Sequence, residues 1–383
     1  MKFVVQGQYN IELFINNQPY ALNNSNFSLI SVIQNCICFL PTFKLILRDL
    51  TGKLIDQYSL KDGSLIDINI GNNDLTQKMK FRVYGVPVSQ PGINGPEIKM
   101  VGYLDHPKYL MKLVEDSDYT DTSSNIIKRI TQICGLDNDI DTTNDKMTWV
   151  PGRKNYSSFA KHLCDYAWNS NTSAFSIGVD FNKKLHFKDV AKLIKSKPIK
   201  QLYWGAPSND LAKNVKAYNC LMYNIKTLSG ILNKWAGYGM KLNQEQLDGT
   251  YIEHKNVQAT RLSNYMEMDG DLKQQIDTAR IEYFPPNCGN VHSKYETAFH
   301  QNRRIRSTFS TLVELITDQF TQSSLFDVVR WQMLNQVDRS VNSAYNGIYI
   351  VAASALMITG QNYYEKIRLY STGRQTDTSG SMV

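Results

Sequence analysis

The chain has 383 residues, of which 42% are hydrophobic and 20% are charged, and its formal net charge is +7. This length exceeds what one compact core usually supports, so we expect two to four domains, and the composition excludes a disordered chain. Basic and acidic residues are interspersed without blocks of one sign. That pattern favours a mixed solvated surface over a nucleic-acid-binding footprint.

Residues 1–103 are predicted to form mainly β-structure. Strands are expected on both sides of Gly7, with a turn at Asn16-Asn17, because hydrophobic and polar residues alternate around these turn formers. In the strand Leu65–Ile70 the leucine and the two carboxamide or carboxylate residues share one face and the three isoleucines share the other. The sequence therefore predicts an antiparallel sheet with one buried face.

Other segments of this region carry weaker signals. We expect further strands at Phe43–Arg48, Leu54–Leu60 and Phe81–Pro87, the first two joined by a turn at residues 49–52. The apolar run Ser28–Phe39 is compatible with a short helix. Residues 88–97 hold two prolines and two glycines, so a loop or a domain boundary is predicted there.

Residues 104–195 have a mixed character. A helix over residues 126–134 is predicted with Ser123 or Ser124 as its cap, and a second helix is predicted after Asn155 or Ser157. A hairpin follows, because hydrophobic residues alternate from residue 175 to 181 and return on the same face after a turn at residues 182–184. The expected order is helix, acidic loop, helix and hairpin.

The last part of the chain is again predicted to be rich in strands. After a basic connector, a new β-region begins near Leu202, and residues 226–307 suit an insertion of uncertain fold with a helix near its end, over Tyr295–Arg306. Four strand candidates then follow one another: Thr308–Thr317, Asp327–Leu334, Gly347–Ala353 and Tyr363–Tyr370. We expect Tyr349 and Val351 to lie on opposite faces of their strand.

We find no motif that predicts a catalytic, cofactor-binding or metal site. The run that starts at Asp137 imitates a calcium loop through Asp137, Asp139 and Asp141, but Thr142 and Thr148 stand where glycine and glutamate are needed, so a solvated acidic loop is expected. A C-x-C pair at Cys36 and Cys38 is not a zinc signature by itself, and the cysteines are expected to be reduced. The histidines are scattered and are expected to be ordinary packing or surface residues: His106, His162, His186, His254, His292 and His300.

Two further groups are weighed as binding elements. Arg303, Arg304 and Arg306 form the densest basic cluster, which is compatible with a solvated helix face, a protein interface or, less readily, nucleic acid. Trp204, Trp235 and Trp331 are compatible with stacking platforms, although core or interface anchors are the commoner role of tryptophan. A glycosidase would need only two carboxylates placed by the fold, which no sequence pattern excludes.

Several segments together resemble the phage tail baseplate hub proteins, a family related to the hub module of the type VI secretion spike. Residues 43–72 resemble the first tube-like β-barrel of that family, with its Gly turn and closing strand. Residues 123–136, 155–168 and 174–189 look like its middle module of helices and a hairpin. Residues 324–331 and 346–374 are similar to the strands that close its second barrel.

The resemblance implies an α+β, β-rich fold with two tube-like antiparallel β-barrel domains and an intervening mixed helix–hairpin domain. The implied domains are residues 1–103, 104–195, and 196–225 with 308–383, and the insertion is residues 226–307. The implied protein is not an enzyme. It is a structural hub that forms a trimeric ring of pseudo-sixfold symmetry and joins the tail tube to the central spike or needle.

The partners implied by the resemblance are a homotrimer, the tail tube protein, the central spike protein, the tape-measure protein and other baseplate proteins. DNA would pass through the lumen without sequence-specific binding, and no stable membrane insertion is expected because the apolar runs are shorter than a membrane helix. The implied location is the virion tail baseplate, assembled in the host cytoplasm. The alternatives are a receptor- or glycan-binding tail protein and a tail-associated cell-wall hydrolase.

Overall fold

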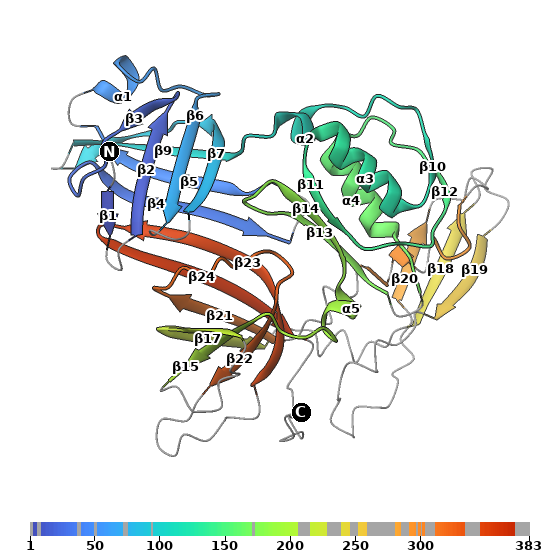
Figure 1. The fold of residues 1–383 in the computed structure, drawn as a ribbon. Coiled ribbons are helices and arrows are strands. Elements are labelled where there is room, and N and C mark those ends of the chain that lie inside the picture. Colours follow the sequence, from blue (N-terminus) through green and yellow to red (C-terminus); the bar gives the residue numbers. More distant parts are fainter. Residues whose placement is uncertain are drawn as a thin grey trace.

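The fold is known from a computed structural model, shown in Figure 1. Strands predominate and helices are few, so the fold is α+β and rich in β-structure. The structure describes residues 3–5, 9–36, 40–49, 52–71, 76–92, 95–170, 173–205, 215–227, 239–245, 252–258, 280–284, 291–295, 298–299, 301–302, 311–333 and 345–371. Among these residues no helix is long and apolar enough to cross a membrane.

The N-terminal region is a curled antiparallel sheet, blue in Figure 1. Its strands are β1 (Phe3–Val5), β2 (Tyr9–Ile15), β3 (Gln18–Tyr20), β4 (Phe27–Asn35), β5 (Thr42–Arg48), β6 (Leu65–Gly71), β7 (Thr76–Gly85), β8 (Val88–Gly92) and β9 (Gly95–Leu104). Buried and half-buried residues alternate along β2, β5 and β6, as predicted for a sheet with one apolar face. Asn16 and Asn17 both have positive φ and form the predicted turn.

Three predictions for this region are wrong. In place of the helix expected over residues 28–39, residues 28–35 form strand: β4 pairs with β5 on one side and with a C-terminal strand on the other. A buried central strand has the same continuous apolar character as a short buried helix. Residues 54–60 begin with a single helical turn, α1 (Lys53–Asp56), because Gly52 has φ 71° and the Leu54 N–H donates to Asp49 Oδ2. Residues 88–92 and 95–97 are strand, because β8 pairs antiparallel with β9.

The middle region packs two helices against a small sheet, seen to the right of the N-terminal sheet in Figure 1. Its elements are α2 (Pro107–Met111), β10 (Tyr119–Asp121), α3 (Ser123–Cys134), β11 (Asp137–Ile140), β12 (Met147–Trp149), α4 (Tyr156–Tyr166), β13 (Phe175–Val179), β14 (Lys184–Asp189) and α5 (Val190–Leu193). The predicted helices and hairpin are confirmed. Thr122, one residue before the expected serines, caps α3, and Asn155 caps α4.

The C-terminal region forms a second curled set of strands below the first. They are β15 (Lys200–Trp204), β16 (Lys216–Asn219), β17 (Met222–Thr227), β21 (Thr311–Thr317), β22 (Val328–Met333), β23 (Gly347–Thr359) and β24 (Asn362–Ser371). All four predicted late strands are confirmed. The prediction for Tyr349 and Val351 is wrong, because residues two apart in a strand share a face and both side chains lie in one buried cluster.

The two curled regions belong to one 16-stranded sheet because β4 pairs with β23. Within the described residues this sheet does not close on itself. Residues 216–219 pair in parallel with β15, and residues 222–227 pair antiparallel with β21. Residues 216–227 therefore lie along β15 at one edge of the C-terminal strands and along β21 at the other edge.

The described part of the insertion contains a separate three-stranded sheet. Its order is β19 (Ile252–Gln258), β18 (Gly239–Glu245) and β20 (Arg280–Phe284). The predicted helix over residues 295–306 is described only in part, and residues 295, 298, 299, 301 and 302 are helical there.

Candidate functional site

The described residues hold a polar, buried junction where all three regions of the chain meet. Gln34 of β4 is its centre, and its side chain is 2% exposed. The Gln34 amide donates 2.8 Å hydrogen bonds to the Ser323 carbonyl and the Ser354 hydroxyl, and its oxygen accepts one of 3.0 Å from the Phe181 N–H. The Gln34 side chain thus links the N-terminal sheet to three elements: the turn of the β13–β14 hairpin, the loop that precedes β22, and the strand β23.

The hairpin lies directly on the end of β4 because β13 carries a glycine at the contact. A Cβ at Gly178 would stand 2.9 Å from Leu325 Cδ1, 3.0 Å from the Asn35 carbonyl oxygen and 3.1 Å from the Cys36 Cα. Any larger residue would push the hairpin away from the strand. The sequence places glycine here for close approach, since its φ is not in the left-handed region.

A chain of hydrogen bonds runs from the middle region into this junction. His186 of β14 lies with Nε2 3.0 Å from Asp180 Oδ2 and Nδ1 3.2 Å from Asp139 Oδ2, and the Ser324 hydroxyl donates to Asp180 Oδ2 over 3.2 Å. Burial alone would raise the pKa of Asp180, but its bonds to His186 and to the Lys184 and Asn182 amides outweigh burial and lower that pKa. Asp180 is therefore held as a carboxylate.

Glu365 of β24 is the second buried acid at the junction. It is 1% exposed and accepts hydrogen bonds of 2.8 Å from both the Thr321 N–H and the Thr321 hydroxyl. Burial raises the pKa of Glu365 to about 7, although the bonds from Thr321 and the charge of Lys200 work in the opposite direction. Glu365 and Asp180, two carboxyls in one junction, thus differ in their ionisation near neutral pH.

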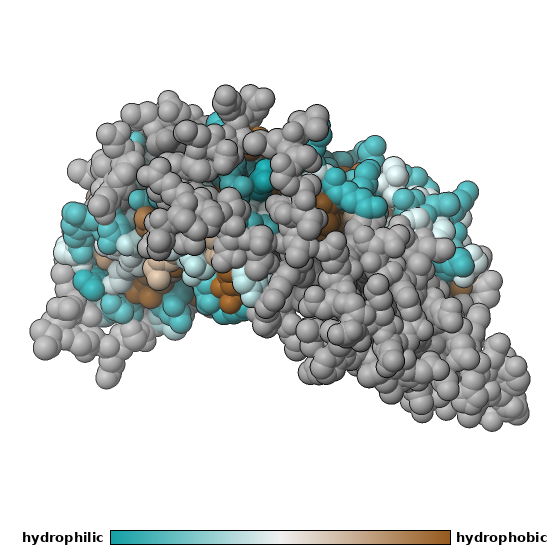
Figure 2. All heavy atoms as spheres, turned by 90° about the horizontal axis from the view of Figure 1, so that it is seen from below, coloured by the Kyte–Doolittle hydropathy of each residue, from teal (hydrophilic) through white to brown (hydrophobic). Residues whose placement is uncertain are grey.

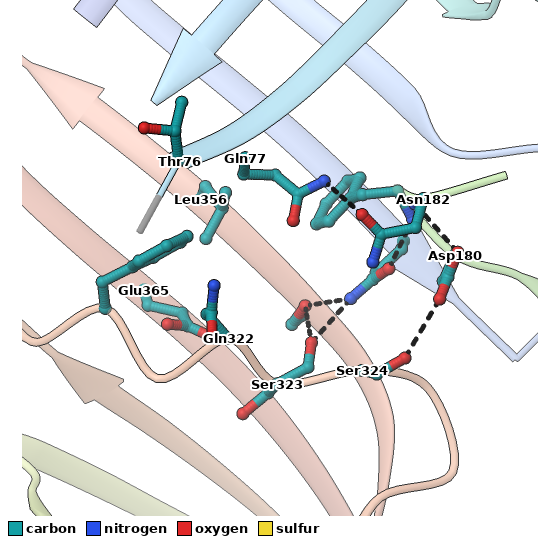
Figure 3. Close-up of a pocket in the computed structure, with 13 residues that line it drawn as sticks. Thr76, Gln77, Asp180, Asn182, Gln322, Ser323, Ser324, Leu356 and Glu365 are labelled. Carbon is teal, nitrogen blue, oxygen red and sulfur yellow. Dashed lines mark hydrogen bonds between the residues drawn. The ribbon is translucent and has the colours of Figure 1, made fainter. Parts of the chain in front are cut away.

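A cavity of about 250 Å³ lies between these groups, and Figure 3 shows its lining. Its walls come from β4, β7, the hairpin turn, the loop before β22, β23 and β24: Gln34, Thr76, Gln77, Asp180, Phe181, Asn182, Phe320, Gln322, Ser323, Ser324, Ser354, Leu356 and Glu365. Most of the lining is amide, hydroxyl and carboxyl. Such a cavity is suited to ordered water between polar groups.

The arrangement at the junction is not a nucleophilic triad. Both ring nitrogens of His186 face carboxylates, and the Ser324 hydroxyl bonds to Asp180, so no imidazole is directed at the serine. Within the part of the chain that the structure describes, no three His, Cys, Asp or Glu side chains stand close enough to hold a metal ion. The chemistry of the junction is that of a structural hydrogen-bond network.

The acidic run at Asp137 is part of the middle region's own sheet, which corrects the prediction of a solvated loop. Asp139 lies in β11, opposite His186 of the parallel strand β14, and pairs with Lys188. Asp141 pairs with Lys188 and accepts from the Asp189 N–H. Later in the run, Asp145 is fully buried and accepts from Ser123 at the start of α3 and from the Trp168 N–H.

The other singled-out residues serve packing or lie beyond the described part. Trp331 is fully buried in the C-terminal core and Trp204 packs against it. His162 and His292 both stand beside the ring of Trp149, with centroids 6.3 and 6.2 Å away, and burial lowers the pKa of His162 to about 4. His254 lies in β19, and further side chains singled out from the sequence lie outside the described residues: Arg303, Arg304, Arg306, Trp235 and His300.

Sequence reasoning did not single out the junction. Gln34, Gly178, Asp180 and Glu365 come from four separate segments that only the fold brings together. One local signal exists: Glu365 occupies an inward position of β24, in line with the buried apolar residues Tyr363, Ile367 and Leu369. A carboxyl in an apolar alternation is costly unless it is bonded, so it marks a buried polar contact.

Comparison with known proteins identifies solved structures that share this fold. No protein-family model matches the sequence, and no curated protein matches it. The fold is similar to the 43 kDa tail protein of prophage MuSo2 from Shewanella oneidensis, with a TM-score of 0.56, 11% identity, and coverage of 96% of this chain and 98% of that one. It is also similar to the tail protein from Neisseria meningitidis MC58, with a TM-score of 0.54, 9% identity and coverage of 96% and 98%.

A third similar structure is the Francisella PdpA-VgrG complex in its half-lidded form, with a TM-score of 0.50 and 9% identity. The match covers 99% of this chain but only 61% of that one. These similarities show that the chain has a phage-tail-protein fold over nearly its whole length. The resemblance inferred from the sequence is thereby confirmed at the level of the fold.

Proposed function

We propose that this chain is the structural baseplate hub of a phage tail, and that it has no enzymatic activity. The observation that carries the proposal is the pairing of two curled strand regions through β4 and β23, which gives each chain two β-faces held in fixed relation. A trimer of such chains would present six of these faces. It could therefore join a sixfold tail tube to a threefold central spike.

The tandem-barrel arrangement is part of this proposal. Residues 216–227 support a second barrel, because they bond to β15 in their first half and to β21 in their second half. The hydrogen bonds continue where the segment passes from β15 to β21. The Cys220 N–H donates to the Tyr203 carbonyl and the Leu221 N–H donates to the Ile316 carbonyl, both over 2.8 Å. The cluster around Trp331 and Tyr349 would fill that barrel.

The proposed partners are two further copies of the chain, the tail tube protein, the spike protein, the tape-measure protein and other baseplate proteins. The fold supports this set, because the similar proteins of matching length are named as tail proteins and a further similar structure is a VgrG complex. DNA would pass through the ring. The protein would lie in the virion baseplate after assembly in the host cytoplasm.

Light scattering combined with negative-stain imaging of the purified chain tests this proposal. We expect a trimer that images as a threefold ring with a central channel. A stable monomer that binds sugar would favour a receptor- or glycan-binding tail protein instead. Hydrolysis of peptidoglycan that is lost on changing one carboxylate would show a cell-wall hydrolase and overturn the proposal.

A further inference from the structure

The two strands that join the curled regions carry a partly exposed row of apolar side chains. β4 and β23 are neighbours, β5 and β24 lie on either side of them, and each of these pairs is antiparallel. One face of β4 and β23 is buried in the core, through Ile30, Val32, Leu356 and Ile358. The residues between these point to the other face. Their apolar members form what we call the apolar stripe: Leu29, Ile33, Ala353, Ala355 and Met357.

The register shows that the apolar stripe is continuous across the two strands. Ile33 lies directly opposite Ala355, and Met357 lies opposite Ser31, a small residue that leaves the surface level. Ile33 is 39% exposed, and the other members of the stripe are exposed in part. An apolar surface with a polar rim is typical of an interaction site.

Cations border the apolar stripe on both sides. On one side are Lys44 and Arg48, at half-buried outward positions of β5. On the other side Lys366 of β24 lies directly opposite Ala355, and Arg368 follows two residues later. Three strand spacings of ~4.8 Å separate β5 from β24, so the two rows of cations are ~14 Å apart.

Nearby acids orient these cations without covering them. Glu97 lies 3.6 Å from Arg48 and is half exposed itself. Glu314 of β21 contacts three cations: Lys226, Lys366 and Arg368. Hydrogen bonds from Lys226 and Arg368 lower the pKa of Glu314, so a single negative charge is shared among three positive ones. The side chains of Lys366 and Arg368 remain 36% and 51% exposed. The borders of the stripe therefore keep an excess of positive charge.

We propose that the apolar stripe binds an amphipathic α-helix of another protein, whose narrow apolar side is flanked on both sides by glutamate or aspartate. A helix with its side chains is ~10–12 Å wide, which fits between rows of cations ~14 Å apart. The strand from Leu29 to Ile33 spans ~13 Å, the length of two to three helical turns. Apolar residues at positions i, i+3, i+4 and i+7 of the partner would lie along the stripe.

The pairing of β4 and β23 explains why the partner is a helix. Both strands have a paired strand on each side, so their backbone groups cannot receive an added strand. An extended segment lying on the apolar stripe would leave its own N–H and C=O groups without partners, whereas a helix satisfies them internally.

The described surface seen from below has small, separate hydrophobic patches among hydrophilic residues, as Figure 2 shows. A surface of this kind suits one narrow element better than a broad, flat partner.

A second copy of the chain does not supply this helix from its described part. There α1, α2 and α5 have only four or five residues, and α3 and α4 already bury their apolar sides within the middle region. The exposed side of α3 carries Lys128 and Arg129, which would meet charges of the same sign at the borders of the stripe. Charge complementarity therefore favours an acidic helix from a different protein.

This inference rests on the proposed function only because a hub joins other proteins, and the binding can be measured without a ring. The test is fluorescence anisotropy of the whole chain with a labelled peptide of about 18 residues, long enough to form a helix. The peptide has leucines at i, i+3, i+4 and i+7 and glutamates on both flanks. One comparison peptide has the same composition in scrambled order, and another has lysine in place of glutamate. We expect only the first to bind at low salt.

Two variants locate the site. Ile33→Asp places a charge in the apolar stripe and should weaken binding about tenfold or more. Its matched control is Ile55→Asp, at an isoleucine of α1 that is 52% exposed, and should bind as the native chain does. The double change Lys44→Gln, Lys366→Gln keeps the stripe intact and should weaken binding several-fold and reduce its salt dependence. Its control removes exposed lysines elsewhere, by Lys53→Gln and Lys108→Gln.

Denaturant unfolding shows whether each variant is folded, and the lysine variant tests the site even if Ile33→Asp is not. Three results would overturn the inference: no binding of the acidic peptide, equal binding of either comparison peptide, or equal losses in the variants and their controls. Light scattering on the same samples adds a fourth, because loss of self-association in Ile33→Asp would assign the stripe to a second copy. A trimer that does not bind the peptide contradicts only this inference, and a monomer that binds it contradicts only the hub.

Discussion

The middle region and the three-way junction hold this chain together by different physical means. The middle region relies on apolar burial, with Trp149, Phe159 and Leu163 fully buried between its helices and strands. The junction relies on Gln34, Asp180 and Glu365, which are buried polar groups with fixed partners. Apolar burial tolerates small shifts, whereas a buried hydrogen-bond network holds only in one geometry. We therefore expect the middle region to supply stability and the junction to supply orientation.

The largest effect is expected in the middle region. Trp149→Ala should lower the free energy of unfolding by about 3–5 kcal/mol, because it removes a fully buried ring and leaves a cavity. It also removes the hydrogen bond from the indole N–H to the Asp121 carbonyl. Denaturant unfolding measures the loss. The control is Val150→Ala, whose side chain is 61% exposed and which should cost less than about 0.5 kcal/mol. Equal effects would contradict the role given to apolar burial.

At the junction, the largest expected effect is a dependence of the free energy of unfolding on pH, caused by Glu365. Its pKa in the folded chain is raised to about 7 from the ordinary value of 4.5, so folding favours the protonated acid. The stabilisation is complete below pH 4.5 and is lost as the pH rises toward and through 7, by about 3 kcal/mol. Unfolding free energies measured between pH 5 and pH 8 should fall in the native chain.

In Glu365→Gln that fall should be largely absent, since the amide does not ionise. Glu115→Gln, at an exposed glutamate, is the control and should keep the native pH dependence. If Glu365→Gln kept the full slope, another group would be responsible and the junction would not be the titrating element.

A smaller loss is expected when the centre of the junction is removed. Gln34→Ala leaves the buried Phe181 N–H without this acceptor and removes one of the two bonds to the Ser323 carbonyl, at a cost of about 1–3 kcal/mol. Hydrogen exchange of the Phe181 amide should speed up. Gln77→Ala removes an exposed bond to Asn182 in the same cavity and should change neither quantity measurably. Similar losses in the two variants would show that burial does not decide the value of these bonds.

The smallest effect concerns the cap of α4. Asn155 Oδ1 accepts a 2.8 Å bond from the Ser158 N–H, so Asn155→Ala should cost about 1 kcal/mol in thermal or denaturant unfolding. Ser157→Ala should cost less, because the Ser158 N–H is capped by Asn155, to whose side chain the Ser157 hydroxyl donates. A larger loss of unfolding free energy in Ser157→Ala than in Asn155→Ala would show that Ser157 caps α4, the alternative that the sequence also allows.

The predictability of each element followed from how local its determinants are. The strands β2, β5 and β6 and the helices α3 and α4 follow from alternation or helical spacing with a cap, and these patterns are complete within a few residues. The strand β4 has the continuous apolar character of a short buried helix, and one of its two partners, β23, is distant in the chain. The junction was missed for the same reason, since Gln34 and Ser323 are 289 residues apart.

Turn chemistry and periodicity are local properties, and they are sufficient to predict the β-rich class, the position of the helix–hairpin unit and the resemblance to tail hub proteins. The distribution of charge depends instead on how the strands pair in space. Along the chain the basic and acidic residues are interspersed and suggest a neutral mixture. Strand pairing places alternate residues on opposite faces and aligns distant strands, so that Lys44, Lys366 and Lys226 come to share one surface. No linear pattern contains this selection by face, which brings distant residues together both on this surface and in the buried junction.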